Sequence, residues 1–558
     1  MFYDGKILMG LSSEGEDIYI YPKMANRHGL IAGATGTGKT VTLKVMAESF
    51  SDAGVPVFVA DAKGDLAGTC KEGVNSEDMT KRMQYFGLTE KGFDFKKYPV
   101  NFWDVYGEKG IPLRTTISEM GPLLLSRLMG LNDTQTDILN IVFKIADENS
   151  LLLIDTKDLK SMLSYVAENS KEYAPMYGNL PPASINVIIR AVVALEAEGG
   201  EQFFAEPALN IKDWLTVNDS GKGMIQILDC QKLMLNPKTY SMFLLWMISE
   251  LYETLPEAGD LEKPRMVFFF DEAHMLFDSA PKILLEKIEQ VVKLIRSKGV
   301  GIYFITQNPK DIPDGVLNQL GNKFQHALRA YTPNEQKAMK AAADGFRENP
   351  SFNTLEVLGE LGTGEALVSV LGEDGVPTVV QRTKILPPSS YMGAIDDLTR
   401  NEKVNSSFLF PKYSDYVDND SAYERLTKLA EEEAEAALKA KEEEEARRAE
   451  EKARIEAEKA EAKAQAQAER EAQKEAERQA REEQKAIENA EKAALKEKEA
   501  KERAVKRAAK NVASSTAGSI GRELGKSVGK TMGGSFGKTL GGNVGASLFR
   551  GIVGTFMK

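Results

Sequence analysis

The octapeptide GATGTGKT at residues 33–40 constrains the fold of this chain more than any other feature. It fits the pattern G-x-x-x-x-G-K-[ST] of a phosphate-binding loop, which follows a buried strand and opens a helix. The apolar segment HGLIAG leads into it. TVTLKVMAESFSDAG follows it and has the composition of a helix that ends near Gly54. The chain is therefore predicted to be an α/β protein that binds a nucleotide at this loop.

Within the loop, the Lys39 ammonium is expected to reach the β- and γ-phosphates, and the Thr40 hydroxyl is expected to ligate Mg²⁺. The glycines let backbone N–H groups surround the phosphates, and the helix N-terminus adds its positive end. The predicted nucleotide-binding residues are Gly33, Thr35, Gly36, Thr37, Gly38, Lys39, Thr40 and Val41.

Three further Gly-Lys-Ser/Thr tripeptides, at 525–527, 529–531 and 537–539, lack the first glycine of the pattern. They belong to a different repeat, in which a glycine recurs every four residues from 521 to 545 after an apolar residue. Such spacing permits close helix contacts, often at membranes, although glycine lowers helix stability. The basic tail 511–558 is therefore predicted either to dock on a membrane surface or protein partner, or to stay flexible.

A second apolar run, MVFFF, ends in Asp271 and Glu272. In a nucleotide-hydrolysing site Asp271 would hold Mg²⁺, and Glu272 would act as general base for the attacking water. Gln307 ends the following strand, VGIYFIT, where its amide could contact both a γ-phosphate oxygen and water. The alternatives are a strand that merely ends in acidic residues and a glutamine that caps a loop.

The order of apolar segments predicts a mainly parallel sheet with helices on both faces. We divide the chain into a small N-terminal β segment (1–27), a core in two parts (28–113 and 216–400) separated by a helical insertion (114–215), and a linker (401–419). A charged helix or loose spacer (420–510) and the basic tail (511–558) follow. The spacer lacks a sustained seam of Leu and Ile, so a stable two-stranded coiled coil is not expected.

Three motifs, GATGTGKT, FFFDEAH and ITQNPKD, together resemble the HerA/FtsK branch of P-loop motor ATPases, in particular bacterial HerA-like proteins of YjgR type. VFVADAKGDLAG, LGTGEALVSVL and LPPSSYMGAID are also similar, so the resemblance covers roughly residues 1–400. It implies a RecA-like core, hydrolysis of Mg-ATP and a hexameric ring. Glu272 and Gln307 match the family's base and sensor glutamine.

The resemblance also implies an arginine that completes the site of a neighbouring subunit. Arg382 is our first candidate for this catalytic role, with Arg329 and Arg296 as alternatives. No local spacing decides among them.

Composition indicates the cellular compartment and the kinds of site to expect for this chain. The 558 residues carry a net charge of −12, and the only cysteines, Cys70 and Cys230, form no framework of pairs, which favours a reduced, cytoplasmic compartment. The N-terminus has no signal-peptide pattern, and no apolar run is long enough to span a bilayer. Three isolated histidines suggest no zinc site.

Two functions remain open at this stage. The first is an ATP-driven DNA translocase or helicase, which the resemblance implies although the chain before residue 511 is acidic and nucleic-acid binding needs a basic patch. The second is a nucleotide-switched oligomeric scaffold that docks a partner or a membrane through the tail. Stimulation of ATP hydrolysis by DNA would distinguish them.

Overall fold

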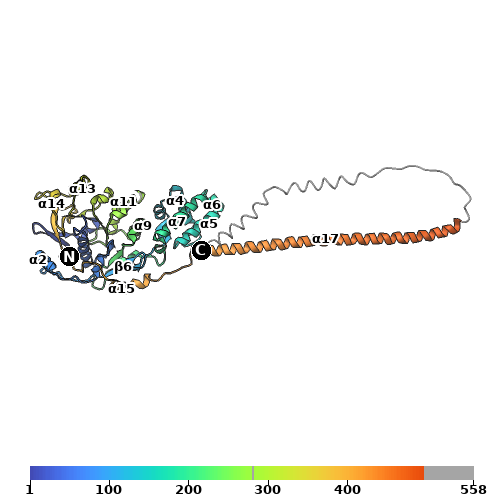
Figure 1. The fold of residues 1–558 in the computed structure, drawn as a ribbon, viewed down its shortest axis with the longest axis horizontal. Helices are drawn as coiled ribbons and strands as arrows, with labels where there is room; N and C mark the ends of the chain where they lie inside the picture. Colours follow the sequence, from blue (N-terminus) through green and yellow to red (C-terminus); the bar gives the residue numbers. More distant parts are fainter. Residues whose placement is uncertain (279–281, 496–558) are drawn as a thin grey trace. The chain divides into compact units, whose positions relative to one another are not determined.

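The computed structural model describes residues 1–278 and 282–495, and a single mixed sheet of 13 strands organises it (Figure 1). The strand order is β1-β2-β13-β12-β11-β4-β10-β9-β5-β8-β6-β7, with β3 paired to β2. Pairing is parallel from β11 to β7 and antiparallel from β11 through β12 and β13 to β2, β1 and β3. The strands are β1 (Phe2–Tyr3), β2 (Lys6–Ser12), β3 (Asp17–Ile20), β4 (Gly29–Ala32), β5 (Val57–Asp61), β6 (Val100–Asp104), β7 (Ile111–Pro112), β8 (Ile225–Asp229), β9 (Met266–Phe270), β10 (Val300–Thr306), β11 (Asn322–His326), β12 (Glu365–Ser369) and β13 (Gln381–Ile385).

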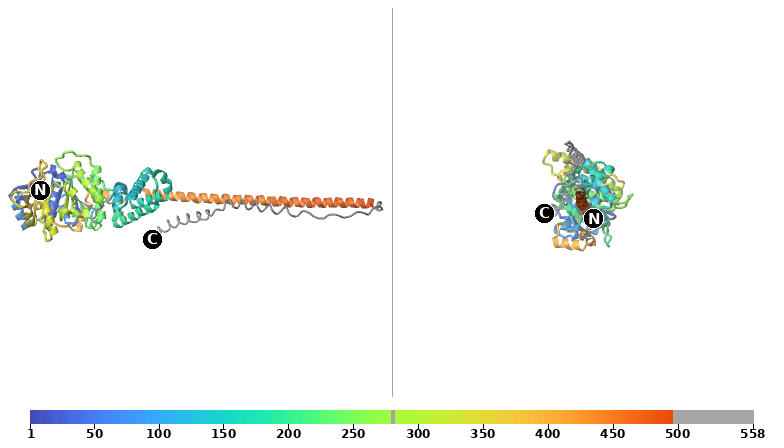
Figure 2. Two further views of the ribbon diagram at one scale, coloured as in Figure 1. Left: turned by 90° about the horizontal axis from the view of Figure 1, so that it is seen from above. Right: turned by 90° about the vertical axis from the view of Figure 1, so that its right-hand side faces the viewer.

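Helices cover both faces of the sheet (Figure 2). Every residue of β4, β5, β8, β9 and β10 is buried, as expected for parallel strands whose sequences are continuous apolar runs. The helices flanking the sheet are α1 (Lys39–Asp52), α2 (Glu77–Phe86), α9 (Pro237–Thr254), α10 (His274–Asp278), α11 (Lys282–Ile295), α12 (Asp314–Leu317), α13 (Pro333–Asp344), α14 (Thr354–Glu360), α15 (Asp397–Asn405) and α16 (Phe410–Tyr413). Short helical turns include η1 (Pro22–Arg27), η2 (Leu66–Cys70), η4 (Ile211–Trp214), η5 (Leu233–Leu235), η6 (Arg296–Lys298) and η7 (Pro309–Asp311).

The segment between β7 and β8 is helical, and its α4 to α7 gather in one lobe (Figures 1 and 2). Capping boxes fix where three of its helices begin, because a side chain at the N-cap and another three residues later satisfy free N–H groups reciprocally. The helical insertion predicted from periodicity is therefore present. Its helices are α3 (Ile117–Leu128), α4 (Asp133–Glu148), α5 (Thr156–Glu168), α6 (Ser170–Tyr177), α7 (Pro182–Leu195) and α8 (Glu201–Phe203), with a π-helical turn, η3, at Glu196–Gly200.

The charged region forms one helix, α17 (Ala422–Leu495), of 74 residues, which corresponds to about 110 Å at 1.5 Å per residue. It begins on the core, where Asp158 Oδ1 accepts a hydrogen bond from Tyr423 N at 2.9 Å. Side chains described from Thr427 onward are exposed, and pairs such as Lys439–Glu435 join adjacent turns at 2.7 Å. The predicted charged helix is confirmed for this range, whereas the glycine repeat and basic tail lie outside the described residues.

Two features of the core differ from the sequence-based expectation. The N-terminal strands, expected only as a small β segment, are part of the main sheet, because β2 pairs with β13. The sequence analysis also missed β6 and β11, whose segments VNFWD and NKFQH contain polar residues at buried positions. Among the described residues no single helix is long and apolar enough to cross a bilayer; the bent pair Ser170–Tyr177 and Pro182–Phe203 meets the length and composition criteria only when taken together.

We predict that Gly223→Ala destabilises the core by about 1–3 kcal/mol or more, because the added methyl would lie 2.0 Å from Val55 O, a backbone atom that cannot move aside cheaply. Gly345→Ala is the matched control, since its methyl would lie 3.5 Å from the nearest atom and its φ is −76°. Urea unfolding followed by tryptophan fluorescence measures both, because all three tryptophans are buried in the core. Equal midpoints for the two variants would contradict the prediction.

Candidate functional site

The predicted phosphate-binding loop connects β4 to α1, as the sequence analysis expected. Neighbouring strands hold its backbone from outside: Gly33 N donates to Thr306 O at 3.3 Å and Ala34 N donates to Ala327 O at 2.9 Å. From the loop before β12, Gly364 N donates to Thr37 O at 3.0 Å. The loop conformation is therefore fixed by segments that lie far away in the sequence.

Gly33 can be no other residue in this arrangement. Its φ is +152°, and a Cβ atom there would lie 2.5 Å from Cβ of His326 on β11. The first glycine of the motif is required because the backbone passes directly over a histidine side chain.

His326 joins the loop region to two elements, and the sequence analysis did not assign it a role. Its Nδ1 lies 2.8 Å from Glu365 O, and its Nε2 lies 2.8 Å from Thr42 Oγ1 on α1. Because a carbonyl only accepts, Nδ1 carries the proton and Nε2 accepts from the threonine hydroxyl. Burial lowers the pKa of His326 to about 4, so the ring is neutral at neutral pH.

The Lys39 ammonium points back into the loop, where it donates to Gly33 O at 2.6 Å and to Ala34 O at 3.1 Å. Burial lowers its pKa, and the nearby charges of Glu272 and Asp271 oppose this shift. The structure thus places Lys39 within the electrostatic reach of both carboxylates predicted from the second motif.

Asp271 and Glu272 directly follow β9, and their environments shift their pKa values in opposite directions. Asp271 is buried, and burial together with the neighbouring charge of Glu272 raises its pKa to about 6. Burial also acts to raise the pKa of Glu272, but Lys63, Gln307 and His274 more than offset it and hold the pKa below its usual range. Glu272 is therefore ionised at neutral pH.

Three groups surround the Glu272 carboxylate. Lys63 Nζ lies 2.9 Å from Oε1, and Gln307 Nε2 donates to Oε2 at 3.3 Å. His274 Nδ1 lies 3.4 Å from Oε2. The Glu272 backbone has a φ of +48°, which is uncommon for a residue other than glycine. The predicted pair Glu272 and Gln307 is therefore brought into contact.

Lys63 is a site residue that the sequence analysis did not name, although it lies in the segment VFVADAKGDLAG that resembles the family. Asp61 shapes this loop by accepting hydrogen bonds from the N–H groups of Lys63, Gly64 and Leu66 at 3.2, 2.8 and 3.2 Å. The resulting turn directs the lysine toward Glu272 on the adjacent strand. An aspartate at a strand end followed by Lys and Gly was the available signal.

The segment after β13 holds the opposite side of α1. Glu48 is buried in the middle of that helix and accepts hydrogen bonds from Ser389 N at 2.6 Å and Ser390 N at 3.1 Å. Lys44, one turn earlier, donates to Tyr391 O. Hydrogen bonds with residues 389–391 thus hold α1, the helix that begins at the phosphate-binding loop, in place.

The three candidate arginines lie in different places. Arg382 Nη2 pairs with Glu365 Oε2 at 2.7 Å, and the Glu365 carbonyl accepts from His326. Arg329 donates to Gly359 O at 2.7 Å and to Leu361 O at 3.1 Å. Arg296 lies before β10, at the sheet edge opposite the loop. None of these observations tests a role toward a second subunit.

The donors present fit a nucleotide with Mg²⁺. Backbone N–H groups and Lys39 at the start of α1 suit phosphate oxygens. The Thr40 hydroxyl and the Asp271 carboxylate supply the hard oxygen ligands that Mg²⁺ prefers, in the small number expected when phosphates and water complete its shell.

Comparison with known proteins gives one family match that spans most of the chain. The family described as "Helicase HerA-like C-terminal" matches residues 6–475. A probable helicase of Methanocaldococcus jannaschii is 33% identical over 125 residues, which are 22% of this chain and 22% of that protein. The DNA double-strand break repair helicase HerA of Sulfurisphaera tokodaii is 20% identical over 371 residues, covering 66% of this chain and 67% of that protein.

The chain thus spans only about a fifth of the length of the first of these relatives and two thirds of the second. Among solved structures, the bacterial conjugative coupling protein TrwB covers 70% of this chain and 91% of its own, at 13% identity and a TM-score of 0.45. VirB4 of Thermoanaerobacter pseudethanolicus covers 69% and 97%, at 17% identity and a TM-score of 0.41.

We predict that His326→Gln flattens the pH dependence of core stability. The pKa of His326 is about 4 in the folded chain and about 6.5 in the unfolded chain. The unfolded state therefore binds more protons below pH 6.5, and stability falls as the pH decreases toward 4. At about 1.4 kcal/mol per pH unit, this histidine accounts for a loss of about 2 kcal/mol between pH 6.5 and 5.

The measurement is urea unfolding of wild type and variant at pH 7 and pH 5, with the difference between the two proteins as the readout. Thr42→Val is the control, because it removes the hydroxyl partner but keeps the titrating ring. An identical pH dependence in wild type and His326→Gln would show that folding does not lower the pKa of His326.

Proposed function

The chain belongs to the HerA-like helicase family, whose model matches residues 6–475, and from this premise we propose that it is a Mg-ATP-hydrolysing motor that moves along DNA. The observation that carries the proposal is the Glu272 carboxylate, held ionised by Lys63 and Gln307 beside the phosphate-binding loop. An ionised carboxylate next to bound phosphates is suited to activate water. The family resemblance seen in the sequence is confirmed; the YjgR subtype remains a prediction.

In the proposed reaction, Glu272 accepts a proton from a water molecule as the water oxygen bonds to the γ-phosphorus and the bond to the ADP oxygen breaks. Gln307 orients this water, and Lys39 offsets the negative charge on the phosphate oxygens. Thr40 and Asp271 would hold Mg²⁺, which neutralises phosphate charge when bound. Lys63 keeps the base deprotonated until water and nucleotide are in place.

DNA as the substrate and a hexameric ring as the assembly are proposals supported by family membership. One relative is named a DNA double-strand break repair helicase. The net charge of −12 favours the second candidate, a nucleotide-switched scaffold that docks a membrane or protein partner through residues 511–558. A cytoplasmic location, with or without attachment through that tail, also remains a proposal.

The test of DNA translocation is the ATPase rate of the full chain with and without single- and double-stranded DNA at a stated salt concentration. Stimulation by DNA that disappears in Lys39→Ala supports the motor. If DNA leaves the turnover rate unchanged and assembly depends on nucleotide, the result would favour the nucleotide-switched scaffold over the DNA motor.

We predict that Glu272→Gln binds ATP but hydrolyses it about 10²–10⁴-fold more slowly, because the amide keeps the shape but cannot accept the proton. Phosphate release and binding of a fluorescent ATP analogue measure the two steps. Lys39→Ala should lose nucleotide binding or turnover, while Lys526→Ala, Lys530→Ala and Lys538→Ala should retain both. If ATP binding is also lost in Glu272→Gln, the glutamate is structural and another group activates water.

We further predict that Arg382 acts on the nucleotide of a neighbouring copy, a role worth about 10³–10⁵ in rate for such arginines. Mixing inactive Arg382→Ala with inactive Lys39→Ala should then restore activity, because a mixed interface can pair an intact loop with an intact arginine. Glu365→Gln is the control, since it breaks the ion pair of Arg382 but keeps the guanidinium. Absence of rescue in mixtures shown to co-assemble would count against Arg382, and Arg329 would be tested next.

A further inference from the structure

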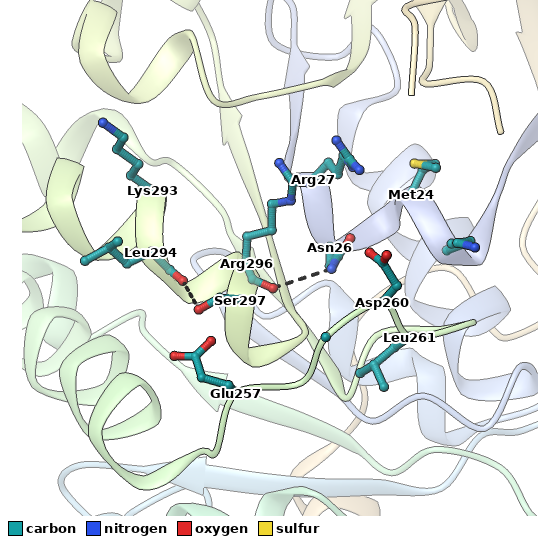
Figure 3. A pocket seen from close by; sticks show the side chains of 12 residues that line it. Met24, Asn26, Arg27, Glu257, Asp260, Leu261, Lys293, Leu294, Arg296 and Ser297 are labelled. Atoms are coloured by element: carbon teal, nitrogen blue, oxygen red, sulfur yellow. Dashed lines mark hydrogen bonds between the residues drawn. The ribbon is translucent and has the colours of Figure 1, made fainter. Parts of the chain in front are cut away.

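A cavity of about 520 Å³, whose lining is drawn in Figure 3, lies at the amino-terminal ends of the central strands. Its walls come from η1, the segment 257–261 that precedes β9, and the end of α11 with η6. β4, β9 and β10 all begin next to these walls and end at the phosphate-binding loop, Asp271 and Gln307 respectively. The cavity is therefore separate from the site described above.

Basic side chains outnumber acidic ones in the lining. Four are basic and two are acidic, and one of the acidic groups, Glu257, is already paired with Lys298 Nζ at 3.1 Å. Within the described part of the chain, the side chains of Arg27, Lys293 and Arg296 make no ion pair and no hydrogen bond. The cavity thus holds more positive charge than its own residues neutralise.

Arg27 and Arg296 come from separate elements, yet their side chains extend toward the same part of the cavity (Figure 3). The pKa of Arg296 is lowered by partial burial and then by repulsion from Arg27; Asp260 opposes this shift but forms no ion pair with it. Basic residues in the last turn of a helix are common because they complement its dipole. That effect explains each arginine singly but not the convergence of two guanidinium groups in one cavity.

The arrangement suits an anion with several oxygens. Two adjacent guanidinium groups that form no ion pair with a carboxylate repel one another, and an anion between them would offset that repulsion. Guanidinium groups present forked donors that match phosphate oxygens in pairs. The volume falls in the usual range for small-molecule sites, about 300–1,000 Å³, and is too small to enclose a nucleic-acid duplex.

We propose that this cavity binds the phosphate or diphosphate group of a small molecule, with Arg27 and Arg296 contacting its oxygens. The proposal is independent of the ATPase mechanism, since it uses none of the residues at the phosphate-binding loop.

Isothermal titration of the full chain with inorganic phosphate and with pyrophosphate tests the proposal. All proteins carry Lys39→Ala, so that binding at the phosphate-binding loop is weakened in the same way throughout. Arg27→Ala and Arg296→Ala should each weaken pyrophosphate binding by about 10–100-fold, the scale of a lost hydrogen bond to a charged group. The pyrophosphate affinity of Arg296→Lys should lie between those of the parent and Arg296→Ala, because lysine keeps the charge but lacks the forked donors of a guanidinium group.

Arg190→Ala is the matched control, because Arg190 is an exposed arginine on α7, away from the cavity. It should bind pyrophosphate as the parent does. Tryptophan fluorescence establishes that each variant is folded. Equal affinity in Arg296→Ala and Arg190→Ala, or no binding in the parent at millimolar pyrophosphate, overturns the proposal. Binding of a single-stranded oligonucleotide that needs both arginines, without binding of pyrophosphate, would replace the small molecule with nucleic acid.

Discussion

The backbone hydrogen bonds around the phosphate-binding loop are the constraint on which the site depends. β4 contributes only four residues, and it is paired on both sides, by β10 and β11. The loop that leaves it is held by Thr306, Ala327 and Gly364, which belong to three other segments. Because these contacts join distant parts of the chain, the loop acquires its shape only when the whole sheet has formed.

The same sheet also determines which charged side chains meet in the site. Parallel strands bring their carboxyl ends to one edge, so Lys63 after β5, Glu272 after β9 and Gln307 after β10 meet although they are far apart in sequence. Lysine and glutamine together keep the glutamate ionised despite its burial. Asp271, one residue earlier, has a raised pKa, because its deeper burial and the charge of Glu272 outweigh the opposing effect of Lys63. Two adjacent carboxylates thereby have different protonation behaviour.

Much of the site could be predicted because its motifs are local. The spacing of Gly33 and Lys39, with a strand before and a helix after, defines the loop without any tertiary information. His326 could not be found in this way. Its strand, β11, has the sequence NKFQH with a single apolar residue, Phe324, and its partners Thr42 and Glu365 are known only from the folded sheet.

The arginines illustrate the same limit. The sequence analysis put Arg382 first, although no local spacing distinguishes it from Arg329 and Arg296, and the structure assigns each a different environment. Arg382 is in an ion pair, Arg329 binds backbone carbonyls, and Arg296 lies in a cavity with Arg27. Whether an arginine has a partner depends on which carboxylates and carbonyls the fold brings near it, and no local pattern encodes that.

The composition of α17 has a consequence for how the chain loses structure on heating. Side chains described from Thr427 onward are exposed, so this part of the helix gains nothing from burial and is stabilised by intrinsic propensity and by pairs such as Glu444–Arg448. Each turn therefore melts nearly independently of the core. Heating should remove helical circular dichroism gradually, starting well below the cooperative transition of the sheet, and added salt should steepen this early loss by screening the pairs.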